Sequence, residues 1–380
     1  CSSLKEFNVE ASNEYYKANG PLLLTSDEKV IILAAPGYDY GRYTIPDSIL
    51  EVKEGAFGGI STLRTLNLNN VTQIGEYAFA ECTALTSVTF ANEKFTIDDG
   101  AFAACTKLAT LVNIKNTKEI GKYAFTSTAL NSIDLGENVN IGEGAFARIT
   151  SLRYAHLYGN TTIGYGAFIN DTGLTTVDID ADAKITASDY AFYNCTKLAS
   201  IDLSKFYDHI GKMAFYATII KVANLTNATS VGDFAFADCT EITTLNMPIM
   251  ETIGDGAFAA YSESSVSGIA ITSLELPTTL RSIGEAAFYT CLNLKTITIP
   301  ANVELKGFIF AYNTSLQSVV LDSSIKTIPN NMFYKATALV NINLENVERI
   351  EDGAFYTCTK LKNVNLSNLS YRNEDCFILL

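Results

Sequence analysis

The chain has 380 residues, of which 48% are hydrophobic, and it carries a formal net charge of −14 at pH 7. This charge argues against nucleic acid and anionic lipid as electrostatic partners, because both are bound by clusters of Lys and Arg. No apolar stretch reaches the ~18 residues that a membrane-spanning helix requires, and two histidines leave few ligands for a zinc site.

The chain opens on Cys1, without a preceding Met. In mature bacterial lipoproteins the N-terminal Cys carries the lipid, although a sequence that merely begins at this point would look the same. We favour lipid attachment at Cys1. Such a lipid would tether the protein to a membrane surface without spanning it, and it is the only contact with membrane that we expect.

Residues 1–42 do not fit the repeat that follows them. Apolar runs at residues 15–24 and 29–33 flank a polar segment at residues 25–28, and this pattern predicts a β-hairpin. A solenoid needs its first coil covered, because its core otherwise opens to water at that end. We therefore assign residues 1–42 as a tether followed by an N-terminal cap.

A short motif, Ile-Gly-x-x-Ala-Phe, organises residues 43–366 and is complete at residues 74–79. A fixed period of this length is typical of a solenoid, in which each coil packs on its neighbours. We expect about fourteen coils, with one column of stacked Phe rings through the core. The repeat Phe residues lie mostly 21 to 24 residues apart and are Phe57, Phe79, Phe102, Phe125, Phe146, Phe168, Phe192, Phe215, Phe236, Phe258, Phe288, Phe310, Phe333 and Phe355.

A second apolar segment in each coil has the form Leu-x-x-Leu-x-Leu, as in Leu63, Leu66 and Leu68. Its alternation of apolar and polar residues indicates a half-buried strand, so the stacked coils should form one parallel sheet on the concave face. We attribute the repeat Gly to a sharp turn that needs dihedral angles other residues avoid. Between this Gly and the position three residues after the Phe, we expect one helical or 3-10 turn on the convex face.

Six of the eight cysteines lie three residues after a repeat Phe. Other coils place Thr128 or Asp171 at this position, so the column tolerates many residue types and does not read as a metal site. We predict small buried hydrophobic residues without disulfide bonds. The six are Cys82, Cys105, Cys195, Cys239, Cys291 and Cys358.

Two further segments depart from the repeat. Residues 262–268 form a Ser- and Gly-rich insertion, which is either a contact loop or neutral variation on the outer side, where loops are tolerated. After Leu366 the pattern fades, and we assign residues 367–380 as a C-terminal cap in which Phe377 and Leu379 cover the last coil.

The full repeat reads Ile-Gly-x-x-Ala-Phe-x-x-Cys-x-x-Leu-x-x-Ile-x-Leu-Pro, and residues 283–300 match it throughout, with Ile299 at the last Leu position. It resembles the BspA-type leucine-rich repeat family of bacterial surface proteins, known from Bacteroides and similar bacteria. The resemblance implies a right-handed α/β solenoid. It also implies a secreted protein or an outer-membrane lipoprotein at the cell surface that mediates adhesion to host matrix proteins, epithelial cells or other bacteria.

A candidate binding site comes from the residues that flank the middle Leu of each strand and point to the concave face. Most are small and polar, as packing on a curved sheet predicts by itself. The middle coils differ, because they combine acidic and aromatic residues. Interface hot spots are enriched in Tyr, and carboxylates can pair with Lys or Arg of a partner. We predict that a protein ligand contacts Asp134, Tyr154, His156, Asp178 and Asp202, with Asp180 just beyond its strand.

Two other functions fit the sequence less well than protein binding does. Capture of a glycan or peptide for nutrient uptake would favour exposed aromatic residues on the concave face, where Tyr154 alone qualifies. A glycosidase would need a carboxylate pair in a cleft with an apolar pocket, which an open polar sheet does not offer. We therefore expect a binding protein without catalytic residues, cofactor or metal.

Overall fold

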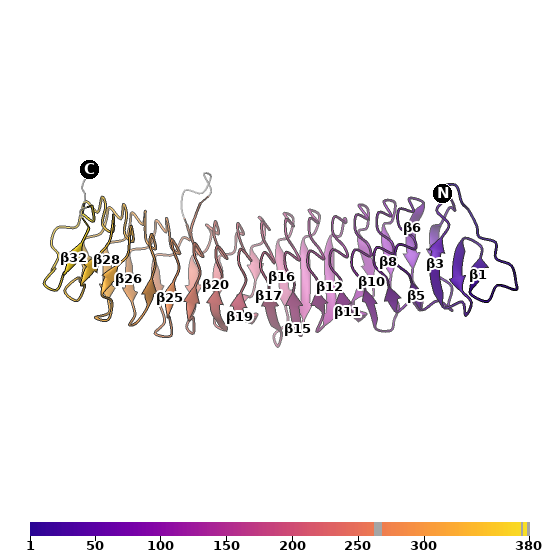
Figure 1. The fold of residues 1–380 in the computed structure, drawn as a ribbon, viewed down its shortest axis with the longest axis horizontal. Coiled ribbons are helices and arrows are strands. Elements are labelled where there is room, and N and C mark those ends of the chain that lie inside the picture. The colour runs from indigo at the N-terminus through magenta and orange to yellow at the C-terminus, as the bar shows by residue number, and fades with distance from the viewer. Residues whose placement is uncertain (262–267, 374, 378–380) are drawn as a thin grey trace. The chain divides into compact units, whose positions relative to one another are not determined.

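The computed structural model describes residues 1–261, 268–373 and 375–377, so most of the 262–268 insertion, and Leu379, lie outside the described residues. The chain divides into two compact units. Unit 1 comprises residues 1–185 and 194–200, and unit 2 comprises residues 186–193 and the chain from residue 201 onward. Each unit is a stack of parallel β coils (Figure 1). No helix in the described part of the chain is long and apolar enough to cross a membrane.

The Leu-x-x-Leu-x-Leu segments form parallel strands, as predicted, but the described strands belong to four separate sheets rather than to one. We call these sheets together the first sheet. Leu66 pairs with Val88 in unit 1, and Ile297 pairs with Val319 in unit 2, both in parallel register. In unit 1 the strands are β4 (Gly41–Thr44), β6 (Leu63–Asn67), β8 (Ser87–Thr89), β10 (Thr110–Val112), β12 (Ser132–Glu137), β14 (Tyr154–Tyr158) and β16 (Thr176–Ile179). In unit 2 they are β20 (Val222–Asn224), β22 (Thr244–Asn246), β24 (Ser273–Glu275), β26 (Thr296–Ile299), β28 (Ser318–Leu321) and β30 (Asn341–Ile342).

A second parallel sheet, which the sequence analysis did not predict, is formed by the residues just before the repeat Gly. Ile74 pairs with Ile97, and Ile120 pairs with Ile141. In unit 1 its strands are β5 (Glu51–Val52), β7 (Gln73–Ile74), β9 (Phe95–Ile97), β11 (Thr117–Ile120), β13 (Asn140–Ile141) and β15 (Asn160–Ile163). In unit 2 they are β19 (Phe206–Ile210), β21 (Ala228–Val231), β23 (Thr252–Ile253), β25 (Ser282–Ile283) and β27 (Glu304–Leu305). The corresponding strands of the last coils, β29 (Thr327–Ile328), β31 (Arg349–Ile350) and β32 (Tyr371–Arg372), form a separate sheet.

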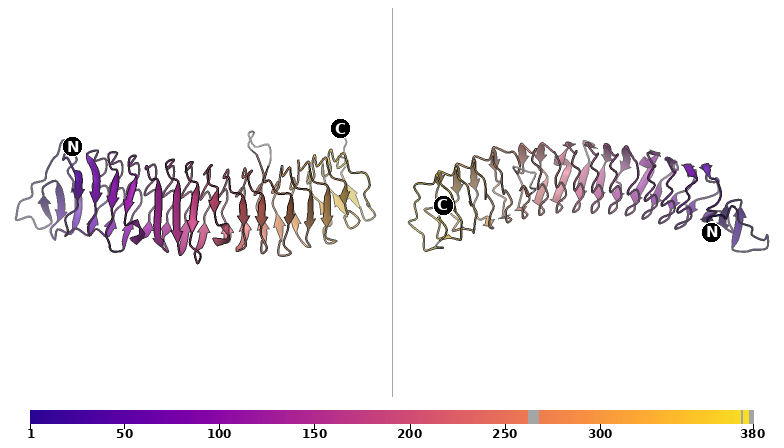
Figure 2. Two further views of the ribbon diagram at one scale, coloured as in Figure 1. Left: turned by 180° about the vertical axis from the view of Figure 1, so that it is seen from behind. Right: turned by 90° about the horizontal axis from the view of Figure 1, so that it is seen from above.

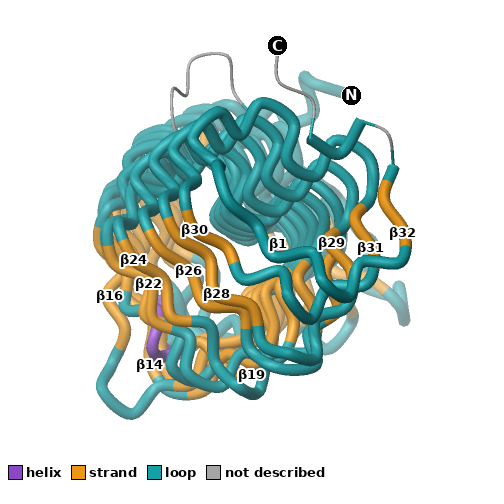
Figure 3. Tube along the Cα trace, turned by 90° about the vertical axis from the view of Figure 1, so that its left-hand side faces the viewer, coloured by secondary structure: helices purple, strands orange, loops and turns teal. Residues whose placement is uncertain are grey.

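Each coil therefore has three sides: the two sheets, and a run of turns around the repeat Phe that we call the turn face. In unit 2, Figure 3 shows β24, β26 and β30 on one side of the coil and β29, β31 and β32 on another. In unit 1, coloured indigo to pink, the views of Figure 2 show successive coils side by side. The division between the units falls within β17 (Lys184–Ala187) and β18 (Ser200–Ile201).

The predicted N-terminal hairpin is present between β2 (Leu22–Thr25) and β3 (Val30–Ala34), which are antiparallel with Leu22 opposite Ala34. The first apolar run also folds on itself, because β1 (Tyr16–Asn19) pairs antiparallel with β2 across the turn at Gly20. β3 then pairs in parallel with β5. The hairpin thereby passes directly into the second sheet.

The predicted column of Phe rings is confirmed within each unit. Phe79, Phe102 and Phe125 are fully buried, with successive ring centroids 5.3 Å apart and planes within 4° of parallel. In unit 2 the column continues past the fourteen predicted rings to Phe377, whose centroid lies 5.1 Å from that of Phe355. Residues 371–373 and 375–377 thus belong to a further, degenerate coil, with β32 paired in parallel to β31.

The prediction of a helical or 3-10 turn on the convex face is wrong. The N–H groups of Ala78 and Ala80 donate to carbonyls three residues earlier, whereas those of Tyr77 and Phe79 donate to the next coil. Beyond its first turn, an α-helix keeps its amide hydrogen bonds within its own segment. In addition, Tyr77 and Glu81 have positive φ, +52° and +57°, outside the range of a right-handed helix. The described chain holds two short 3-10 helices, η1 (Ile114–Asn116) and η2 (Leu203–Lys205), and both follow first-sheet strands.

The reason proposed for the repeat Gly is also wrong. A Cβ added at Gly142 would lie 2.7 Å from the carbonyl carbon of Gly121, and one at Gly75 would lie 2.9 Å from the nitrogen of Glu54. The repeat Gly is therefore required by the close approach of the preceding coil rather than by its dihedral angles. Positive φ occurs instead two residues before the Phe, as at Gly144.

The six column cysteines are buried free thiols, as predicted, and the structure gives them a polar contact as well. Each Sγ donates a hydrogen bond to the carbonyl of the repeat Phe in the preceding coil, with Sγ–O distances between 3.0 and 3.8 Å. Burial raises the pKa of Cys239 and of Cys358 to about 12. The thiols of Cys239 and Cys358 are therefore protonated donors at neutral pH.

Asp171 occupies the same column and gives the first testable prediction. It is fully buried, Oδ1 accepts the N–H of Ile149 at 2.6 Å, and Oδ2 has no hydrogen-bond partner among the described residues. Burial raises its pKa well above the ordinary value. The folded state then retains a proton that the unfolded state releases, so the free energy of unfolding falls as pH rises from the unfolded pKa to the folded pKa, and it stays lower above that window.

We expect Asp171→Asn to remove this pH-dependent loss in the free energy of unfolding. The variant should therefore gain stability over the wild type as pH rises from about 4, the unfolded pKa of Asp. Urea unfolding at a series of pH values measures it. The exposed Asp182→Asn is the matched control and should leave the pH dependence in place. Parallel curves for wild type and Asp171→Asn would contradict the prediction.

Candidate functional site

The central strands of the first sheet in unit 1 bring most of the predicted site residues together. β12, β14 and β16 pair in parallel, with Asp134 opposite His156 and His156 opposite Asp178. Because residues opposite each other on paired strands point to the same face, these side chains form one row across the three strands. Asp180 follows directly after β16 and joins the row through a contact with His156.

His156 lies at the centre of these contacts. Its Nε2 is 3.1 Å from Oδ1 of Asp180, and its Nδ1 is 4.0 Å from Oδ1 of Asp134. Its ring stacks on that of Tyr158, with centroids 3.9 Å apart and planes 19° from parallel. The imidazole is therefore held on three sides, and its side chain is 19% exposed.

Tyr154 extends the row toward β16. Its hydroxyl donates to Oδ2 of Asp178 at 3.1 Å and lies 3.4 Å from Nδ1 of His156. Desolvation, and then the hydrogen bond to Asp178, raises the pKa of Tyr154. The phenol therefore stays protonated at neutral pH and holds the Asp178 carboxylate in a defined position.

Two residues that the sequence analysis missed complete the cluster. Lys115, on η1, places Nζ 2.8 Å from Oδ2 of Asp134, 3.2 Å from the hydroxyl of Tyr158 and 4.9 Å from the centroid of the Tyr158 ring. The hydrogen bonds to Asp134 and then to Tyr158 raise the pKa of Lys115. Tyr158 follows His156 by two residues and was visible in the strand alternation, whereas no repeat pattern marks Lys115.

We call this cluster the sheet patch; it consists of Lys115, Asp134, Tyr154, His156, Tyr158, Asp178 and Asp180. Three of its side chains carry negative charge at neutral pH, and Lys115 carries positive charge. The side chains of Asp134 and Asp180 are about half exposed, while the Oδ1 atom of Asp134 is buried and has no hydrogen-bond partner in the described chain. The patch is therefore a surface of net negative charge whose side chains contact and position one another.

Asp202 and Cys1 are the two remaining residues that the sequence pattern singled out. Asp202 belongs to unit 2, where it caps η2: its Oδ1 accepts the N–H and the hydroxyl of Ser204 at 3.0 and 2.6 Å. Cys1 is exposed, and its carbonyl accepts the N–H of Leu4 at 3.1 Å. The lipid on Cys1 stays a prediction.

Comparison with known proteins finds a matching repeat family and similar solved structures. Residues 40–153, 161–269 and 261–378 match the BspA type leucine rich repeat region. A leucine-rich repeat protein from Bacteroides ovatus is 22% identical with a TM-score of 0.63, over 96% of this chain and 87% of that one. A leucine rich cell surface protein from Faecalibacterium prausnitzii is 21% identical with a TM-score of 0.50, over 88% and 95%. These likenesses show the fold.

One curated protein is also similar. Protein ecm33 of Aspergillus fumigatus is 21% identical over 246 residues, which are 64% of this chain and 52% of that protein. The chain thus spans about half the length of this relative.

Proposed function

The chain belongs to the BspA-type leucine-rich repeat family, and we propose that it binds protein ligands at a bacterial surface through the sheet patch. The fold is typical of surface and protein-interaction proteins. Adhesion to host matrix proteins or to other cells is the form of binding that we propose for this chain. Attachment of the chain to the surface through a lipid on Cys1 is part of the same proposal.

The observation that carries the proposal is the preorganisation of the sheet patch. Its side chains rise from three hydrogen-bonded strands and are fixed to one another by the contacts of His156 and Tyr154. A surface held in its bound conformation loses little conformational entropy on association. The corresponding positions on β8 are Ser87 and Thr89, whose short side chains offer no such network.

The chemistry of the patch indicates what a partner must supply. Asp178 and Asp180 are exposed carboxylates, the first in contact with the hydroxyl of Tyr154 and the second with Nε2 of His156. Carboxylates of this kind accept paired hydrogen bonds from the guanidinium of Arg. A basic segment with Arg is therefore the ligand that this patch fits, and its association should weaken as salt is added.

We expect Tyr154→Ala combined with Asp178→Ala to weaken binding about tenfold or more, because the pair removes an aromatic contact and its carboxylate partner together. The measurement is surface plasmon resonance against immobilised fibronectin, laminin and collagen and against whole bacterial cells. Ser87→Ala with Thr89→Ala is the matched control, because these residues occupy the same two columns on β8. Equal affinity for the two double variants, or no binding of the wild type to any of these surfaces, would reject the sheet patch.

A further inference from the structure

The turn face of unit 1 carries a regular pairing of aromatic rings with glycines. Two residues before the repeat Phe, Tyr77 is followed in the next coil by Gly100, and Tyr123 is followed by Gly144. A Cβ added at Gly100 would collide with ring carbons of Tyr77, and one at Gly144 would collide with those of Tyr123. Each ring therefore lies over the glycine of the next coil, which has no side chain to displace it.

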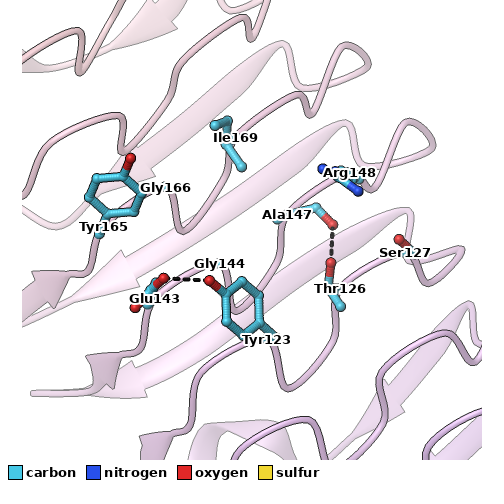
Figure 4. A pocket seen from close by; sticks show the side chains of 10 residues that line it. All are labelled: Tyr123, Thr126, Ser127, Glu143, Gly144, Ala147, Arg148, Tyr165, Gly166 and Ile169. Atoms are coloured by element: carbon cyan, nitrogen blue, oxygen red, sulfur yellow. Dashed lines mark hydrogen bonds between the residues drawn. The ribbon is translucent and has the colours of Figure 1, made fainter.

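The pairing is interrupted at Gly166. This glycine follows Gly144 in the same column. Both have positive φ, +58° at Gly144 and +55° at Gly166. Gly144 has no ring to lay over it, and a Cβ at Gly166 would find its nearest contact, at 3.5 Å, in Ile169 of the same coil. The place where a ring would rest on this coil is thus uncovered, and a hollow of about 380 Å³ lies there (Figure 4).

Tyrosine rings, the apolar side chains of Ala147 and Ile169, and polar groups form the walls of the hollow. Tyr123 and Tyr165 lie on one side with Glu143 between them, and Arg148 lies across the hollow from Glu143 (Figure 4). Tyr123 and Tyr165 are 42% and 48% exposed. The hydroxyl of Tyr123 donates to Oε1 of Glu143, and Nζ of Lys122 lies 3.6 Å from Oε2, so the carboxylate is held in place.

We infer that this hollow binds one sugar ring of a saccharide, seated over Gly166 between Tyr165 and Glu143. The apolar C–H face of a sugar ring packs on an aromatic face, while its hydroxyls lie at the rim. Carboxylate oxygens of Glu143 accept hydrogen bonds from such hydroxyls, and the guanidinium of Arg148 donates to them. The volume falls at the lower end of the ~300–1,000 Å³ of small-molecule sites, as one ring requires.

An aromatic side chain of a peptide is the competing occupant, and the rim argues against it. Thr126, Ser127, Glu143 and Arg148 surround the hollow with polar groups. A Phe, Tyr or Trp side chain has at most one polar atom to meet them, whereas a sugar ring has several. Desolvating the remaining groups without partners would oppose the binding of an aromatic side chain.

The test is a printed array that holds neutral and acidic oligosaccharides together with Phe-, Tyr- and Trp-containing peptides. We expect the wild type to bind at least one class of saccharide, and Tyr165→Ala to weaken that binding about tenfold, because it removes one aromatic wall. Tyr77→Ala is the matched control: Tyr77 is 49% exposed on the same face but does not line the hollow. Glu143→Gln keeps the shape of the side chain and should reduce binding by removing its charge.

The proposal is overturned if no saccharide is retained by the wild type above the level of Tyr165→Ala, if Tyr77→Ala loses binding equally, or if the peptides are bound in place of the saccharides. Thermal unfolding of each variant checks that the fold is intact. The Tyr154→Ala and Asp178→Ala double variant should retain saccharide binding in full. Its result separates the hollow from the sheet patch, so that either proposal can fail alone.

Discussion

Replacing Phe125 with Ala should lower the free energy of unfolding by about 3–5 kcal/mol, the typical cost of truncating a buried Phe. The ring is fully buried and stacks between Phe102 and Phe146, with centroids 5.3 and 5.5 Å away. The backbone of the coil is tied to its neighbour, since the N–H of Phe125 donates to Ala145 at 2.8 Å. The cavity therefore has little freedom to collapse. Urea unfolding followed by circular dichroism and by tyrosine fluorescence measures the loss.

The end of the column supplies the control for this prediction. Phe377 stacks on one ring, that of Phe355, and its side chain is partly exposed. Because the described residues stack a ring on it from one side, and its side chain is partly exposed, Phe377→Ala should cost clearly less, about 1–2 kcal/mol. Equal costs at the two positions would contradict the view that each ring is supported from both sides.

The elements that the sequence predicted correctly are those whose residues recur at the same position in every coil. Phe79 and Phe102 lie in one register, and Leu66 and Val88 lie in another, so the period alone places each pair in neighbouring coils. The same reasoning brought Tyr154, His156 and Asp178 together, because they alternate on strands in adjacent coils. A repeated position becomes a spatial neighbour wherever coils stack in parallel.

The second sheet and the structure of the turn face depend on hydrogen bonds between coils, which no local pattern displays. Gln73 and Ile74 form a strand of two residues, too short to show an alternation. The segment around Tyr77 and Phe79 has the length of a helical turn, but its amides donate alternately within the coil and to the next coil. Local sequence therefore predicted a helix where stacking imposes turns.

The two proposed binding sites also contain parts that the sequence could predict and parts that it could not. Lys115 reaches the sheet patch from η1, outside the repeat, and its position follows from the fold alone. The hollow on the turn face did leave a sequence signal, namely Gly144 and Gly166 two residues before consecutive repeat Phe residues. That signal gains meaning only when Tyr123 is known to lie over Gly144.

Replacing Gly136 with Ala should also be strongly destabilising, by about 1–3 kcal/mol, the usual cost of overpacking. Gly136 is buried in β12, where the register shifts between Asp134 and Glu137. A Cβ at this position would collide with the carbonyl oxygen of Lys115 and lie 2.9 Å from its carbonyl carbon. These are backbone atoms, so no rotamer change relieves the collision, and β12 and η1 must move apart.

Gly58→Ala is the matched control for this substitution. Gly58 is exposed, and a Cβ there would lie 3.3 Å from the carbonyl oxygen of Gly55, at a position that Ala80 and Ala103 occupy in the next coils. Gly-to-Ala substitutions at compatible positions stabilise a protein by about 0.4–1 kcal/mol, because they restrict the unfolded chain. Urea unfolding of both variants measures the two effects on one scale.

Both substitutions restrict the unfolded chain alike, so the difference between Gly136→Ala and Gly58→Ala reports the collision in the folded state. If β12 and η1 move apart, the contact between Lys115 and Asp134 is broken as well. Gly136→Ala should then weaken ligand binding at the sheet patch even under conditions where the protein is fully folded, while Gly58→Ala leaves binding unchanged. A stable Gly136→Ala variant with wild-type affinity would show that η1 does not need to lie against β12 for the patch to work.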